Sequence, residues 1–294
     1  MRDLVAVSVT AMAVLMLSAS AYSRETSPLA SYIQETAPAQ IGAKDFESAS
    51  FDSSASIDNQ WFPQKPGTRL VFRGTTTEGK ERVLHRVVFT VTDLTKTIAG
   101  VRNVVLWERD YSAGKLSEAE IAFFAQDNDG NVWQLGEYPE EYEAGKIVAS
   151  PLWIHGLQRA KAGLSMRAVP RTGTPSYSLG WGPAIGFNDR AKVLKIGQRT
   201  CVPHGCYKKV LIVDEYNPDE PGKHQLKYYA RGVGNVRVGW SGKNEDTKET
   251  LMLVAINRLG PEAMAQARAA ARRLEASAYK RRKAYRQTPP LERG

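Results

Sequence analysis

The chain has 294 residues, and its 40 lysines and arginines against 31 aspartates and glutamates give a formal net charge of +9. Hydrophobic residues make up 42% of the sequence, while glycine and proline number 24 and 15. This composition excludes a collagen-like, low-complexity or largely disordered chain, because it supplies enough apolar side chains to bury a core. The presence of only two cysteines excludes a disulfide-dense scaffold and an all-thiolate zinc site.

The N-terminus has the pattern of a secretory signal. Arg2 precedes a mostly apolar run over 4–17, and the Ala-Ser-Ala sequence at 19–21 suits a signal peptidase. We therefore expect residues 1–21 to be a signal peptide that is removed on export. A retained anchor is the alternative, but the apolar run is shorter than the roughly 20 residues that cross a bilayer. We expect no transmembrane segment in the rest of the chain.

The next segments predict a flexible leader and then a β-rich domain. Residues 22–50 are rich in Ser, Ala, Thr and Pro and show neither a strand nor a helix period, so we expect a leader there and an ordered domain over 51–260. β-Branched and aromatic runs separated by turn residues predict strands over 82–91, 104–107, 121–125, 132–135, 210–213, 225–230, 235–238 and 251–256. Successive hairpins without alternating helices predict a mainly β fold, an antiparallel sheet forming a curved half-barrel, a barrel or a sandwich.

The only long helical pattern lies at the C-terminus. Pro261 suits a first helical position, and residues 262–286 contain eight Lys/Arg and two Glu. We expect a basic α-helix over 261–288 and a tail over 289–294. Because its apolar face is mostly alanine, we favour a solvated helix, with weak contact to an anionic surface as the alternative. Nucleic acid is not an expected partner outside the cytoplasm.

Two motifs carry a resemblance to a known family. Residues 127–137 read D-x-x-G-N-V-W-x-x-G-E, and residues 227–234 read K-Y-Y-A-x-G-V-G. With the order and spacing of the residues around them, these motifs resemble a widespread family of uncharacterised exported bacterial proteins, over roughly 51–240. The resemblance implies a bacterial source, export and a β-rich fold, and it implies no activity. The cysteine-bearing loop, the segment 175–188 and the C-terminal helix differ from the family's usual pattern.

The two cysteines lie close together in the sequence Cys201-Val-Pro-His-Gly-Cys206. In an exported protein this spacing predicts a disulfide that closes the tip of a hairpin. The alternative is a zinc or copper site that includes His204, but no fourth ligand is visible nearby. We therefore expect no metal and no cofactor.

Acidic residues gather around one predicted hairpin, namely Asp127, Asp129, Glu137, Glu140 and Glu141. Calcium favours such oxygen ligands, but the positions do not fit an EF-hand loop. We favour a turn in which aspartate side chains bond to nearby backbone N–H groups. Acid and base catalysis by Asp129 and Glu137 is the alternative.

Histidines offer little for nucleophilic catalysis. His85 alternates in phase with Val83 and Val87, so we expect a buried, hydrogen-bonded histidine rather than a base. His155 follows Trp153 in a break between β runs, a place that suits the edge of a cleft.

For function, we expect a non-enzymatic, periplasmic or secreted binding protein whose curved sheet holds a small apolar ligand or an envelope partner. The expected ligand-binding residues are Trp133, Trp153, His155, Tyr228 and Tyr229. One alternative is a hydrolase of envelope carbohydrate or lipid that acts through Asp129 and Glu137. Another is a structural interaction module without a pocket.

Overall fold

The computed structural model describes residues 10–11, 14–15, 46 and 51–294. The expected signal peptide and leader lie outside the described residues, apart from the few positions just named. Within that N-terminal part, β1 (Thr10–Ala11) and β2 (Val14–Leu15) pair with each other as a separate antiparallel sheet.

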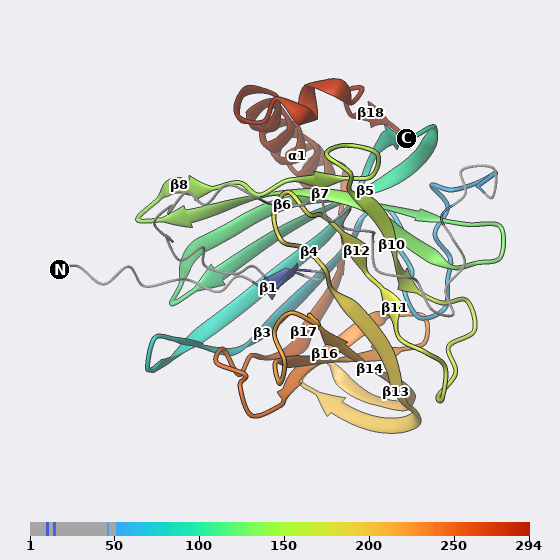
Figure 1. The fold of residues 1–294 in the computed structure, drawn as a ribbon, viewed down its shortest axis with the longest axis vertical. Helices are drawn as coiled ribbons and strands as arrows, with labels where there is room; N and C mark the ends of the chain where they lie inside the picture. Colours follow the sequence, from blue (N-terminus) through green and yellow to red (C-terminus); the bar gives the residue numbers. More distant parts are fainter. Residues whose placement is uncertain (1–9, 12–13, 16–45, 47–50) are drawn as a thin grey trace, which may run out of the picture.

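One large antiparallel sheet forms the body of the protein (Figure 1). Its first half consists of β3 (Thr68–Glu78), β4 (Glu81–Ile98), β5 (Val101–Ser112), β6 (Lys115–Gln126), β7 (Val132–Glu143), β8 (Lys146–Ala149), β9 (Trp153–Ile154) and β10 (Lys161–Met166). Its second half consists of β11 (Tyr177–Ser178), β13 (Arg190–Val202), β14 (Gly205–Tyr216), β15 (His224–Ala230), β16 (Gly234–Ser241) and β17 (Thr250–Arg258), while β12 (Gly180–Trp181) pairs with β10 at the edge of the first half.

The strand order is β11-β13-β14-β15-β16-β17-β3-β4-β5-β6-β7-β10-β12, with β8 and β9 paired to β7. The two ends of this order, β11 and β12, are not paired with each other, so the sheet stays open. The predicted mainly β, antiparallel fold is confirmed, and among its forms the closed barrel is wrong.

The sheet has two chemically different faces. Along β4, buried His85, Val87 and Phe89 alternate with exposed Arg86 and with Thr90, because successive strand residues point to opposite faces. We call the face of His85 the inner face and the face of Arg86 the outer face. In Figure 1 strands β4–β7 lie above β13–β17, and α1 lies above β4–β7.

The C-terminal helix packs on the outer face of the sheet. Helix α1 (Pro261–Arg281) contacts β4, β6 and β7, and a 3-10 turn, η2 (Ala284–Gln287), follows it. Ala267, Ala271, Leu274 and Ala278 of α1 are buried against the strands. The expectation of a solvated helix is therefore wrong, because small alanine side chains let the helix backbone approach the sheet closely. No helix in the described part of the chain is long and apolar enough to span a membrane.

A buried ion pair holds the helix to the sheet. The Nζ of Lys96 on β4 donates to Glu275 Oε1 on α1 at 2.8 Å, and the Tyr285 ring centroid lies 4.2 Å from the same ammonium. Lys96 is 0% exposed, and burial lowers its pKa while the contact with Glu275 opposes that shift. Without Glu275 the ammonium would be left buried and unpaired.

The last residues also belong to the folded domain. Leu291 is buried, and its backbone N–H donates to Glu275 Oε1 at 2.8 Å. Strand β18 (Glu292–Arg293) then pairs with β4. The tail expected over 289–294 thus extends the contacts that begin in the helix.

The predicted disulfide is present at the tip of the β13–β14 hairpin, where Cys201 and Cys206 are paired in the strand register. The intervening His204 accepts or donates a hydrogen bond with the Tyr207 hydroxyl at 2.7 Å. A loop this short contributes about 2 kcal/mol by the chain-entropy relation, so it is a local clasp rather than a determinant of the fold.

We predict that Glu275→Ala lowers the free energy of unfolding by about 3–5 kcal/mol, because it leaves the buried Lys96 charge without a partner. Urea unfolding followed by tryptophan fluorescence measures this change. Glu262→Ala, at an exposed position of the same helix, is the control and should have little effect. Equal stability of the two variants would contradict a structural role for the Lys96–Glu275 pair.

Candidate functional site

Four carboxyl side chains face one another on the inner face of β5 and β6. The strand register places Glu108 directly opposite Glu120 and Asp110 directly opposite Glu118. All four are at most 2% exposed. Directly opposed residues of an antiparallel pair have Cβ atoms about 4.5–5.5 Å apart, and like charges at such positions repel. The pairing of β5 with β6 therefore brings four acidic groups together in a square, and ionising all four would cost the folded protein stability.

Glu137 extends this square onto β7. Its register partner on β6 is Ala122, two residues from Glu120, and its partner on β9 is Trp153. The Gln134 side chain donates to Glu137 Oε2 at 2.7 Å. Burial raises the pKa of Glu137 to about 8, although hydrogen bonding from Trp153 and Gln134 opposes that shift. The Glu137 side chain is therefore largely protonated at neutral pH.

His85 lies at the other end of the acidic square. Its Nε2 lies 2.5 Å from Asp110 Oδ1 and its Nδ1 lies 2.8 Å from Glu249 Oε1. Burial disfavours the charged ring, but the two carboxylates outweigh burial and raise the pKa of His85 to about 10. The predicted buried, hydrogen-bonded histidine is confirmed, and it is an imidazolium held between two acids.

The remaining carboxyl groups of the square resist ionisation. Burial is the largest cause of the raised pKa of Asp110, Glu118 and Glu120. Neighbouring acids add to the shift at Glu118 and Glu120, whereas the His85 charge opposes it at Asp110. Several buried oxygens accept no hydrogen bond, namely Asp110 Oδ2, Glu118 Oε1 and Glu120 Oε2. Over residues 51–294 and the few described positions before them, no three His, Cys, Asp or Glu side chains are close enough to hold a metal ion. We call Glu108, Asp110, Glu118, Glu120 and Glu137 the acidic cluster.

The inner face of the second half of the sheet is also polar. Burial raises the pKa of Glu215 on β14 to about 7, while Lys227 on β15 opposes the shift. Tyr229 is buried beside Glu215, and both burial and the Glu215 charge raise the pKa of its hydroxyl. The inner face is thus lined with ionisable groups on both sides of β3.

The acidic residues predicted around one hairpin are separated by the fold. Asp129 is exposed in the β6–β7 turn, whereas Glu137 lies five residues into β7, about 17 Å along the strand at the usual rise. Asp127 accepts hydrogen bonds from the Asn131 backbone N–H at 2.8 Å and from the Trp133 indole at 2.8 Å. Asp127 therefore stabilises the turn, and Asp129 lies apart from the acidic cluster.

The five aromatic and imidazole residues predicted to bind a ligand also fall in different places. Trp153 lies on the inner face opposite Glu137 and stacks on Phe187. Trp133 and His155 both contact the Phe46 ring, at centroid distances of 5.9 and 4.3 Å. Tyr228 and Tyr229 are adjacent on β15 and point to opposite faces.

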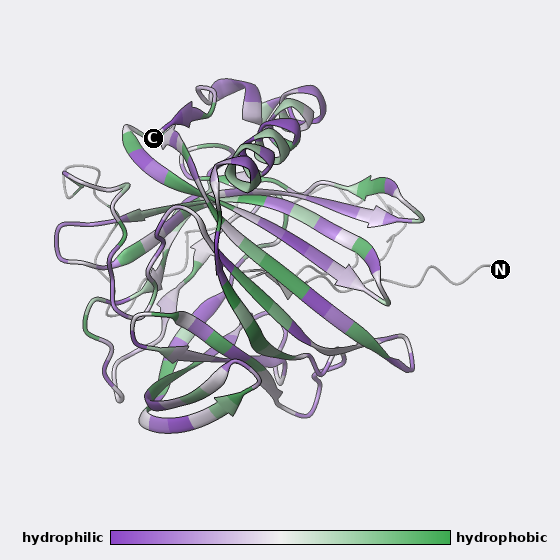
Figure 2. Ribbon diagram, turned by 180° about the vertical axis from the view of Figure 1, so that it is seen from behind, coloured by the Kyte–Doolittle hydropathy of each residue, from purple (hydrophilic) through white to green (hydrophobic). Residues whose placement is uncertain are grey.

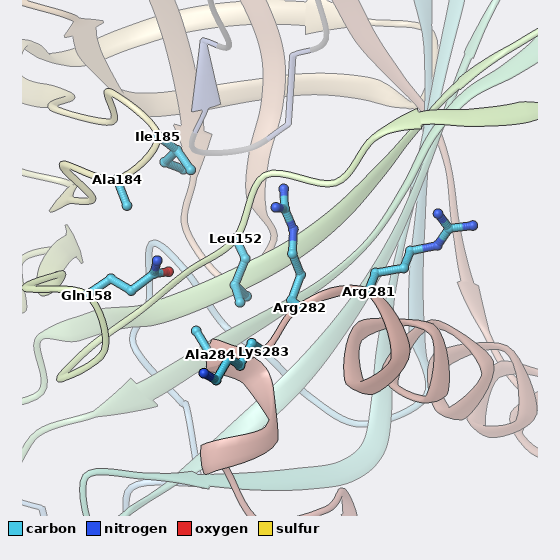
Figure 3. Close-up of a pocket in the computed structure, with 8 residues that line it drawn as sticks. All are labelled: Leu152, Gln158, Ala184, Ile185, Arg281, Arg282, Lys283 and Ala284. Carbon is cyan, nitrogen blue, oxygen red and sulfur yellow. The ribbon is translucent and has the colours of Figure 1, made fainter.

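A small hollow of about 180 Å³ lies where α1 ends (Figure 3). It is lined by Leu152, Gln158, Ala184, Ile185, Arg281, Arg282, Lys283 and Ala284. In Figure 3 the Arg281 side chain points away from the other labelled residues, and the Arg282 guanidinium donates to the Ser150 carbonyl. The hollow is smaller than the roughly 300–1,000 Å³ typical of ligand sites.

The sequence predictions missed four of the five members of the acidic cluster. The expected strands 104–107 and 121–125 end where the apolar residues end, which leaves Glu108, Asp110, Glu118 and Glu120 outside them. The sequence does contain a signal for these residues, because Glu108 and Asp110 are two positions apart, as are Glu118 and Glu120. Residues two positions apart point to the same face of a strand. Buried carboxylates run against the usual preference, so the apolar pattern alone placed the strand ends too early.

Comparisons with known proteins identify no family. No protein-family model matches the chain, and no curated protein matches it. One similar solved structure is described as a candidate exported protein with a YmcC-like fold from Bacteroides fragilis. It is 14% identical, covers 68% of this chain and 100% of its own, and has a TM-score of 0.40. Another, a candidate lipoprotein from Parabacteroides distasonis, is 12% identical over the same shares, with a TM-score of 0.37. At these scores the likeness supports no inference about function.

We predict that the free energy of unfolding falls as the pH rises from about 5 to 8. Over this range the unfolded state ionises at Glu137, whose ordinary pKa is 4.5, while the folded state keeps it protonated up to a pKa of about 8. Glu137→Gln should remove part of this fall, on the order of a few kcal/mol, and the raised pKa of His85 should sustain a further fall toward pH 10.

Urea unfolding at a series of pH values measures both slopes. Glu143→Gln, an exposed carboxyl on the same strand, is the matched control and should leave the profile unchanged. A profile of Glu137→Gln that superimposes on the wild-type profile would show that Glu137 ionises normally in the folded protein.

Proposed function

We propose that this chain is an exported, non-enzymatic binding protein whose inner face takes a ligand bearing amines or other cationic groups. The observation that supports this proposal best is the acidic cluster, with two directly opposed carboxyl pairs and Glu137 beside them. The cationic His85 lies at the edge of the cluster, and it is already held by Asp110 and Glu249. These carboxyl groups favour a cationic ligand over the apolar one expected from the aromatic residues.

Electrostatics explains why a cation would bind strongly. Two ionised carboxylates about 5 Å apart repel each other by about 3 kcal/mol at an effective dielectric constant of 20. In the free protein, protons relieve this repulsion, as the raised pKa values of Glu118 and Glu120 indicate. A ligand ammonium placed among the carboxylates would replace those protons and satisfy the buried oxygens that lack hydrogen bonds.

A second candidate function is acid-catalysed hydrolysis at the same place. Glu137 is protonated near neutral pH, as a general acid must be. Glu120 or Glu118 would then be its carboxylate partner instead of Asp129, which is exposed in the turn. This candidate needs a substrate to enter the inner face beside Trp153, the register partner of Glu137.

Spermidine is a suitable probe for the proposed cationic site. We predict that it binds the purified protein and that Glu118→Gln with Glu120→Gln weakens binding at least tenfold in isothermal titration calorimetry. Binding should strengthen from pH 6 to pH 9, because the carboxyl groups must lose their protons to pair with amines.

The control for this experiment is the double variant Glu143→Gln with Glu262→Gln, which removes two exposed carboxyls elsewhere. Equal weakening in both double variants would mean nonspecific attraction and would overturn the proposed site. Release of sugar or acyl products by the wild-type protein, lost in Glu137→Gln, would favour the hydrolase instead.

Export is tested separately. The apolar run over 4–17 and the small residues at 19–21 predict a mature N-terminus within a few residues of Tyr22. Intact-mass measurement of the protein recovered from the periplasm or the medium checks this expectation. An uncleaved Met1 start on protein found only in the cytoplasm would contradict export.

A further inference from the structure

The part of the outer face that α1 leaves uncovered carries a row of arginines and aromatics. Successive register pairs connect β15, β16, β17, β3, β4 and β5 through Tyr228, Arg237, Met252, Arg73, Arg86 and Tyr111. We call these six residues the arginine row. Figure 2 shows α1 crossing one end of strands β4–β7, with hydrophilic and hydrophobic segments alternating along the strands beyond it.

Positive charge is concentrated here without neutralising acids. Arg73 and Arg86 are directly opposed, a placement that costs stability when the charges are alike. Within residues 51–294, neither they nor the flanking Arg69 and Arg109 form an ion pair with a described carboxylate. Burial and then the Arg86 charge lower the pKa of Arg69, and burial is also the main cause of the lowered pKa of Arg109.

Aromatic rings hold the arginines along the surface. Arg86 lies over the Tyr111 ring at 5.1 Å and Arg237 lies over the Tyr228 ring at 5.0 Å. Beside the row, Arg109 lies over the Trp107 ring at 4.1 Å. In these contacts the flat faces of the guanidinium groups pack on aromatic rings, and the N–H groups at their edges stay available to bind an anion.

A hollow of about 380 Å³ opens in the middle of the row. It is lined by Arg73, Gly74, Leu84, His85, Arg86, Tyr111 and Gly114. Leu84 is 75% exposed, and Met252 in the same row is 38% exposed. The surface therefore combines guanidinium groups with accessible apolar side chains.

We propose that the arginine row is a docking surface for an anionic lipid bilayer. Six neighbouring strands span about 24 Å at the usual spacing of about 4.8 Å, which is too long for one small anion and suits an array of lipid headgroups. Arginines would pair with the headgroup phosphates, while Leu84, Met252 and the aromatic rings would enter the interfacial layer. Charge complementarity and the exposed apolar side chains together favour a membrane over a soluble polyanion.

This surface is independent of the acidic cluster, which lies on the opposite face of the sheet and shares only β5 with the arginine row. On β5, Glu108 and Asp110 point to the inner face while Arg109 and Tyr111 point to the outer face. A protein docked through the arginine row would therefore keep its inner face turned away from the lipid.

Vesicle co-sedimentation of the full chain tests the proposal, with vesicles of phosphatidylglycerol and phosphatidylcholine compared with phosphatidylcholine alone. Arg73→Gln with Arg86→Gln should weaken binding to the anionic vesicles at least tenfold, because each basic residue near such a surface contributes about fivefold. Added salt should weaken wild-type binding, and Leu84→Ala should reduce the part of it that survives high salt.

The matched control removes two positive charges from exposed positions of α1, as Arg273→Gln with Lys280→Gln, and should bind vesicles like the wild type. Every variant keeps the same N-terminus, so any contribution of that segment cancels in the comparison. Loss of binding in the helix variant rather than the sheet variant would overturn the proposal. Binding of the wild type to heparin but to neither vesicle type would also overturn it, in favour of a soluble polyanion.

Discussion

The in-register pairing of β5 with β6 is the constraint on which the chemistry of this protein depends. Backbone hydrogen bonds determine which residues face each other, and here they place Glu108 against Glu120 and Asp110 against Glu118. Side chains on a strand cannot rotate away to the other face, so the repulsion between the acids is part of the folded state. Their raised pKa values and the charged His85 are responses to that arrangement.

The period of two along each strand separates charges of opposite sign. Acids are concentrated on the inner face of β5–β7, while Arg73, Arg86 and Arg109 lie on the outer face of β3–β5. Helix α1 covers the other end of that outer face through Lys96 and its alanines. The uncovered remainder is basic, so one sheet carries a buried acidic cluster on one side and a basic, partly apolar surface on the other.

Local sequence patterns predicted much of the fold, but they did not predict the acidic cluster. All eight expected strands lie within observed strands, because β-branched alternation and turn residues are local signals. The helix start at Pro261 was also predicted, but its packing was not, since an alanine-rich face gives a weak amphipathic signal. Asp129 and Glu137 seemed close because they share one hairpin, and the extended strand separates them.

By itself the sequence determined that the chain is mainly β, that a basic helix follows at Pro261, that Cys201 and Cys206 are near enough to bond, and that His85 is buried. Each of these follows from residues a few positions apart. The tertiary structure decided which acids face each other and which arginines share a row, because those neighbours lie on different strands. Register between strands is set by the summed packing and hydrogen bonding of the whole sheet, which no local pattern contains.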